Sequence, residues 1–167
     1  VNKPMIFTVI MGGVNISFTL LAIYTVEKFG RKPLLIVGSL LMSMGAAGVA
    51  LINIITLPAW VAVMSILVYS AAFMFSWGPI CWVYMSELFP NTIRSQATAI
   101  AVAFQWISNF AVSASFVPIY NYSHSMVYVI YGVICLVAAL FVWKLVPETK
   151  GKTLEEITTM WRERSKK

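Results

Sequence analysis

Five side chains that can hydrogen-bond or stack stand inside long apolar segments of the sequence. They are Asn15, Trp82, Gln105, Trp106 and Asn109. An amide in an apolar setting is costly without a hydrogen-bond partner. Amides both donate and accept hydrogen bonds, which matches the hydroxyls of a sugar, while a tryptophan ring matches its C–H faces. The set therefore favours a neutral polyol as ligand, although the same amides could instead bond neighbouring helices.

The segment SWGPICW contains a helix-breaking pair, Gly78 and Pro79, in the middle of an apolar run. Such breaks are tolerated within a membrane where the freed carbonyls line a cavity or find partners. Gly78 lies four residues before Trp82, and Gln105 lies four before Asn109, so each pair would share one helix face. We expect a kink that opens beside the Trp82 ring.

Other kinds of chemistry are poorly represented in this sequence. The single histidine, His124, falls in a predicted loop, and no carboxylate lies within any of the apolar segments. Cys81 and Cys135 lack metal-ligand spacing, and no glycine-rich phosphate loop precedes a helix. We therefore expect neither an enzyme nor a bound metal or cofactor.

Long charge-free runs define the elements that must hold these side chains. The 167 residues are 60% hydrophobic and only 11% charged, whereas soluble domains carry roughly a quarter charged residues. A membrane helix needs about 20 apolar residues. The charge-free runs predict an all-α integral membrane fold with five spans, at residues 4–26, 34–56, 59–86, 95–117 and 126–146. Polar, proline-containing turns are predicted at 53–58 and 118–125.

Span 34–56 is rich in small residues between Gly38 and Gly48. Small residues let membrane helices approach one another closely. The sequence does not distinguish a static contact from an interface that moves.

The basic residues predict how the spans are oriented. If the five spans alternate in direction, every lysine and arginine except Lys3 falls on one side. The positive-inside rule makes that side cytoplasmic. The net charge of +6 is therefore explained by membrane topology, and we expect no nucleic-acid partner. We expect the five spans to lie in the lipid bilayer. Residues 147–167 are expected to form a short cytoplasmic tail, with a helix that begins at a capping box from Thr153 to Glu156.

Five segments carry a resemblance to a known family. They occur in this order: EKFGRKP, SWGPICW, SELFPNTIR, FQWISN and PETKGKTLEE. Each lies at the span edge or mid-span where the sugar porter family of the major facilitator superfamily has its counterpart. The sequence resembles the last five helices of that twelve-helix family, and within it the bacterial D-xylose–proton symporter branch.

The resemblance implies a sugar-binding site and gives its members. By their match to the family's motifs they are Asn15, Gly78, Trp82, Gln105, Trp106 and Asn109. The resemblance implies that Asn15 and Gln105 hydrogen-bond the sugar. It implies that Gly78 allows the kink to gate and that the Trp82 ring covers the sugar. Trp106 and Asn109 are expected to line the same cavity.

The resemblance also implies a cytoplasmic network of charges that holds the two transporter halves together when the site faces outward. Its members here are Glu27, Arg31, Glu87, Arg94 and Glu148. Glu27 stands where the family commonly has aspartate. From the residues alone, solvated and unpaired loop charges remain the alternative.

These inferences lead to one expected function and two alternatives. We expect a portion of a monosaccharide transporter of the bacterial inner membrane, with residues 1–146 as its membrane part and a cytoplasmic C-terminus. It would work by alternating access with an absent N-terminal portion, and be proton-coupled in the complete protein. Because Val1 stands at the edge of a span, we expect a truncated or excised piece. A non-transporting remnant and a transporter-derived sensor are the alternatives, and pentose against hexose stays open.

Overall fold

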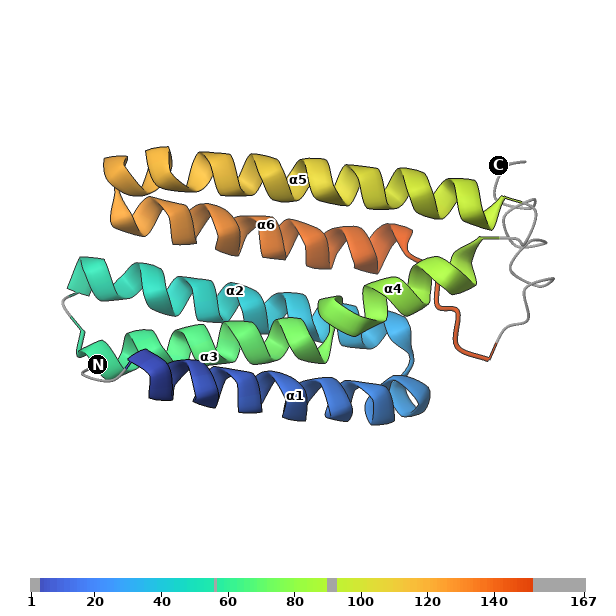
Figure 1. The fold of residues 1–167 in the computed structure, drawn as a ribbon, viewed down its shortest axis with the longest axis horizontal. Helices are drawn as coiled ribbons and strands as arrows, with labels where there is room; N and C mark the ends of the chain where they lie inside the picture. Colours follow the sequence, from blue (N-terminus) through green and yellow to red (C-terminus); the bar gives the residue numbers. More distant parts are fainter. Residues whose placement is uncertain (1–3, 56, 90–92, 152–167) are drawn as a thin grey trace.

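The computed structural model describes residues 4–55, 57–89 and 93–151, and this part of the chain is helical. Its helices are α1 (Pro4–Phe29), α2 (Arg31–Ile55), α3 (Ala59–Phe75), α4 (Trp77–Leu88), α5 (Arg94–Tyr122) and α6 (His124–Leu145). They form an elongated bundle whose helices run along its long axis, with α4 inclined to the others (Figure 1). The predicted tail helix, with its capping box at 153–156, lies outside the described residues.

The predicted number of spans is confirmed within the described residues. Five helical stretches are long and apolar enough to cross a membrane, namely Met5–Phe29, Arg31–Ile52, Ala59–Met85, Arg94–Tyr122 and His124–Leu145. The third stretch combines α3 and α4. The connection between the first two spans is shorter than the gap between the predicted spans 4–26 and 34–56, since α1 continues to Phe29, α2 begins at Arg31 and Gly30 alone separates them.

The turn predicted at 118–125 is wrong in extent. Helix α5 continues through Pro118 to Tyr122, and Ser123 alone separates it from α6. Proline removes one backbone hydrogen bond, whereas ending the helix before Pro118 would leave several more backbone groups without their helical partners. His124 is consequently the first residue of α6, and its ring contacts Tyr120 at a centroid distance of 4.3 Å.

The helix break in the third span lies just before Gly78 and Pro79, at Ser76. Ser76 has φ −127° and ψ −84° and separates α3 from α4. The ring of a proline clashes with the carbonyl four residues earlier, here that of Phe75. Pro79 falls in the first turn of α4, where a missing N–H costs no helical bond. Pro79 thus explains why the helix breaks, but the break itself lies at Ser76 and not at Gly78 or Pro79.

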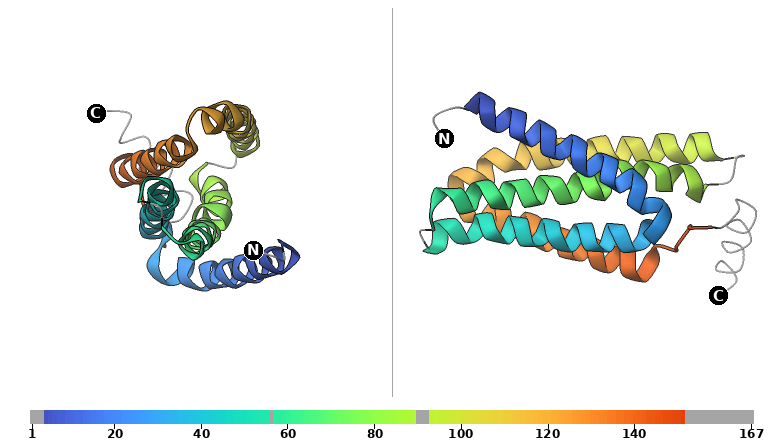
Figure 2. Two further views of the ribbon diagram at one scale, coloured as in Figure 1. Left: turned by 90° about the vertical axis from the view of Figure 1, so that its left-hand side faces the viewer. Right: turned by 90° about the horizontal axis from the view of Figure 1, so that it is seen from below.

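Helix α2 is the centre of the bundle and lies between α3 and α6 (Figure 2). Small residues allow this: a Cβ on Gly45 would lie 2.9 Å from the Ser65 carbonyl oxygen, and one on Gly132 would lie 3.6 Å from the Ala46 Cβ. The predicted close approach along 38–48 is therefore confirmed. Helix α5 contains no buried residue and meets the bundle mainly through α6.

Gly38 provides a direct test of this packing. A Cβ there would lie 1.8 Å from the Ser76 Oγ and 2.3 Å from the Ser76 Cβ. We expect Gly38→Ala to lower the free energy of unfolding by about 1–3 kcal/mol, because overpacking forces neighbours apart. Thermal unfolding in detergent measures it. Gly12→Ala is the control, since a Cβ there meets nothing within 4 Å. Equal melting temperatures for the two variants would contradict this packing.

Candidate functional site

The corner between α1 and α2 is a single glycine in a left-handed conformation. Gly30 has φ +92°, which side chains other than glycine rarely adopt, and its N–H donates to the Val26 carbonyl over 3.0 Å. Helix α2 therefore begins immediately after α1 ends. The first N–H groups of α2 have no acceptor within the helix and need one from elsewhere.

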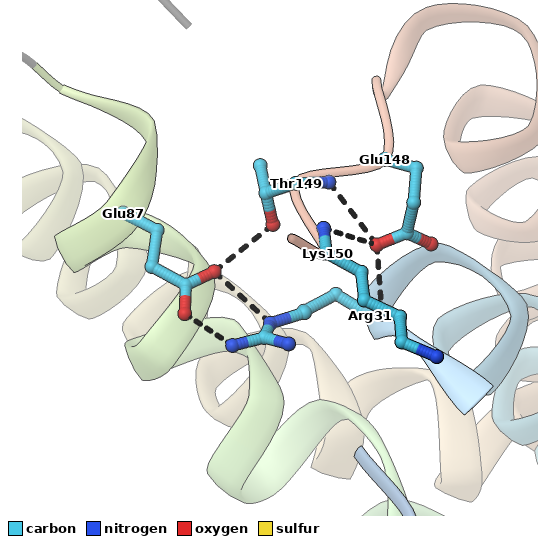
Figure 3. Close-up of polar contacts among 5 residues, drawn as sticks. All are labelled: Arg31, Glu87, Glu148, Thr149 and Lys150. Carbon is cyan, nitrogen blue, oxygen red and sulfur yellow. Dashed lines mark hydrogen bonds and ion pairs between the residues drawn. The ribbon is translucent and has the colours of Figure 1, made fainter. Parts of the chain in front are cut away.

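The carboxylate of Glu148 supplies that acceptor from the other end of the sequence. The backbone N–H of Arg31 donates to its Oε1 and that of Lys32 to its Oε2, each over 3.0 Å. Oε1 also accepts the N–H groups of Thr149, over 3.1 Å, and Lys150, over 3.0 Å (Figure 3). A negative charge at a helix N-terminus is stabilised by the helix dipole. A Cβ on Gly30 would lie 2.8 Å from Oε2, so the glycine also makes room for this carboxylate.

Lys150 completes the corner on the α1 side. Its Nζ donates to the Lys28 carbonyl in the last turn of α1 over 2.7 Å. A cation is favourable at a helix C-terminus. The short segment after α6 thus places the Glu148 carboxylate at the N-terminus of α2 and the Lys150 ammonium at the C-terminus of α1.

Arg31 extends these contacts to α4. Its guanidinium Nε donates to Glu87 Oε2 over 3.0 Å, and its Nη2 pairs with Glu87 Oε1. The Thr149 hydroxyl donates to the same Oε2 over 2.9 Å, and the Tyr84 hydroxyl donates to the Pro147 carbonyl over 3.0 Å. We call Arg31, Glu87, Glu148, Thr149 and Lys150 the corner cluster (Figure 3). It joins α2, α4 and the segment after α6.

Two of the five predicted network charges lie outside the corner cluster. Glu27 is exposed and makes no hydrogen bond or ion pair with the described residues; with Arg31 it lines a cavity of about 210 Å³. The Arg94 Nε donates to the Phe89 carbonyl over 3.2 Å, which bridges the connection between α4 and α5. Thr149 and Lys150 were not singled out from the sequence, although both belong to the PETKG motif.

A second feature is a cavity of about 620 Å³ beside the helix break, which we call the kink cavity. Helices α3, α4 and α5 form most of its wall. Its lining includes three predicted site residues, Gly78, Trp82 and Gln105, together with Thr19, Trp77 and Cys81. Trp82 is 48% exposed. The amide of Gln105 and the ring of Trp82, distant in sequence, therefore face a shared space.

The other three predicted site residues do not line the kink cavity. Asn15 accepts a hydrogen bond at Oδ1 from the Ser70 hydroxyl over 2.7 Å, which joins α1 to α3 and leaves the amide N–H groups for another partner. Trp106 is 67% exposed, and Asn109 is exposed. Both stand on the open face of α5.

The family follows from comparison of the whole sequence. A model of the family described as "Sugar (and other) transporter" matches residues 1–161. The chain belongs to this family. The resemblance predicted from the five motifs is confirmed.

Curated members of the family are similar over almost the whole chain. The D-xylose–proton symporter of Escherichia coli K12 is 49% identical over 96% of this chain, which corresponds to 34% of that protein. The arabinose–proton symporter of Bacillus subtilis is 39% identical over 96% of this chain and 35% of its own length. The chain thus spans about a third of the length of these relatives. They are transporters and not enzymes, as expected from the sequence.

Solved structures have the same fold. The inward-open xylose transporter of Escherichia coli aligns with a TM-score of 0.86 at 52% identity, over 93% of this chain and 35% of that one. A structure of a proton:xylose symporter bound to 6-bromo-6-deoxy-D-glucose aligns with a TM-score of 0.89 at 48% identity, over 96% of this chain and 35% of that one. The helical arrangement is therefore that of the family.

The Glu148 contacts predict a specific effect on stability. Glu148→Gln keeps the size of the side chain but removes its charge and one of its two acceptor oxygens. We expect the free energy of unfolding to fall by about 1–3 kcal/mol, because at least one N–H group at the start of α2 loses its acceptor and the charge at the helix N-terminus is lost. Thermal unfolding in detergent measures the change. Glu27→Gln is the control for an acid without such contacts, and the same melting temperature in both variants would refute the capping role.

Proposed function

We propose that this chain is a portion of a monosaccharide transporter of the D-xylose–proton symporter kind. The kink cavity is the observation that carries the proposal. None of the described residues that line it is charged, yet it combines an amide, two indole rings and the hydroxyls of Thr19 and Ser108. An uncharged wall with a few donors and acceptors suits a neutral sugar better than an ion or a carboxylate.

The names of the relatives support the same class of substrate. They include transporters of D-xylose and arabinose, and a neighbouring structure holds a glucose analogue. We assign sugar contacts to Gly78, Trp82 and Gln105 at the kink cavity. We assign Asn15, Trp106 and Asn109 to the part of the site that faces the absent N-terminal portion.

The same proposal gives the chain its place in the membrane. Residues 1–146 form the last five helices of a twelve-helix fold in the inner membrane, and residues 147–167 form a cytoplasmic tail. The corner cluster then lies on the cytoplasmic side, where most basic residues gather. Substrate sits between the two halves of such a transporter, so transport, with its coupling to protons, requires the absent portion.

Alternating access assigns a role to the corner cluster. Its ion pair joins α4, which borders the kink cavity, to the start of α2. A conformational equilibrium shifts by the difference in interaction free energy between its two states. An ion pair that forms in one state and breaks in the other therefore sets the balance between them, together with Glu27 and Arg94 at the same end.

Binding of D-xylose to the transporter that contains this chain tests the sugar site. We expect Trp82→Ala and Gln105→Ala each to weaken binding by about 1–3 kcal/mol. Each removes a side chain that contacts the sugar, and in the cavity water no longer replaces that contact. Isothermal titration calorimetry gives the affinities. Trp143→Ala, at an exposed position on α6, is the control. Unchanged affinity in both site variants would remove the assignment.

A separate prediction concerns the corner cluster. We expect Arg31→Ala and Glu87→Ala to slow uptake of labelled xylose strongly while leaving sugar affinity within about twofold, because the ion pair lies outside the kink cavity and acts on the equilibrium between states. Lys144→Ala is the control for loss of an exposed charge. Loss of binding in parallel with uptake would argue against a gating role.

A further inference from the structure

The start of α4 is held against α2 by contacts at and beside the break. Ser76 is fully buried, and its hydroxyl donates to the Ala72 carbonyl over 2.8 Å. Gly38 of α2 lies directly against Ser76, because a Cβ there would be 1.8 Å from the Ser76 Oγ. The break in the helix is thus fixed in position by α2, yet these contacts do not set the direction in which α4 leaves it.

Trp77, the first residue of α4, provides a directional contact to α2. Its indole Nε1 donates to the Ser39 Oγ over 2.7 Å, and the Ser39 hydroxyl donates in turn to the Leu35 carbonyl over 2.8 Å. Ser39 is 1% exposed. A hydroxyl has one donor and two acceptor positions, and the Leu35 carbonyl fixes the donor. Ser39 therefore presents an acceptor of set direction to the indole.

The indole of Trp77 is also anchored by apolar packing. It contacts two buried clusters, one of Leu34, Leu35, Ile80 and Val142 and one of Met42, Ala72 and Cys135. The same side chain lines the kink cavity beside Gly78 and Trp82. Trp77 therefore joins the centre of the bundle to the wall of the cavity.

We propose that Trp77, through its hydrogen bond to Ser39, is a positioning residue for sugar binding in the kink cavity. The bond fixes the first turn of α4 on α2 and so sets where Gly78 and Trp82 lie relative to Gln105 on α5. Trp77 was outside the site residues that the sequence predicted. This inference rests on the proposed function, because it assigns a role within the same cavity.

Conservative variants test the bond in the transporter that contains this chain. Trp77→Phe keeps an aromatic ring and removes the donor, and Ser39→Ala removes the acceptor. We expect each to weaken D-xylose affinity about fivefold, the effect of one net hydrogen bond. The double variant should bind D-xylose no more weakly than the more affected single variant, since both substitutions remove the same interaction. Trp143→Phe on α6 is the matched control. Unchanged affinity in both single variants, or independent effects that multiply, would overturn the proposal.

A second readout separates this proposal from the proposed function. Cys81 of α4 is partly buried and lines the kink cavity. We expect Trp77→Phe and Ser39→Ala to raise the alkylation rate of Cys81 by N-ethylmaleimide about fivefold, since α4 is released from α2. Mass spectrometry of the Cys81 peptide measures the rate without any sugar. An unchanged rate would overturn the positioning role even where sugar binds. Absence of sugar binding by the unmodified protein, with the rate change present, would instead refute the proposed function.

Discussion

The backbone N–H groups that begin α2 must find acceptors, and the Glu148 carboxylate accepts two of them. That requirement explains several otherwise unrelated features. Gly30 adopts a positive φ and leaves space for the carboxylate, so α1 and α2 can meet in one residue. The segment after α6 lies at the same place, and its Lys150 donates to the last turn of α1. Opposite charges are thereby matched to opposite helix ends, which stabilises both dipoles.

Helix α4 connects this corner to the kink cavity. Its twelve residues are roughly 18 Å long at 1.5 Å per residue. It is bonded to α2 near both ends, through Trp77 and Ser39 at one and through Glu87 and Arg31 at the other. A movement of the whole of α4 away from α2 would break both the Trp77–Ser39 bond and the Arg31–Glu87 pair. The same short helix thus gives a physical connection between the kink cavity and the ion pair, which lie apart from one another.

The sequence predicts well what depends on composition and less well what depends on contacts between distant segments. Charge-free runs suffice for the five spans, because the bilayer sets a fixed length. The end of α5 was missed because Pro118 and the polar residues after it indicate a turn, whereas the helix tolerates the loss of one backbone hydrogen bond and continues to Tyr122. The contacts of Lys150 and Trp77 were missed because each depends on a partner, Lys28 or Ser39, that only folding brings near. Of the predicted sugar site, Gly78, Trp82 and Gln105 meet at one cavity.

The central claim is that this chain supplies one part of a sugar transporter whose site is shared with the absent portion. Uptake of labelled xylose into cells that lack their own pentose transporters tests it most directly. The chain is expressed alone and together with the preceding two thirds of the Escherichia coli D-xylose–proton symporter. The account predicts uptake on co-expression and none from the chain alone. Absence of uptake in both cases, with both pieces present in the membrane, would contradict it and favour a remnant or a sensor.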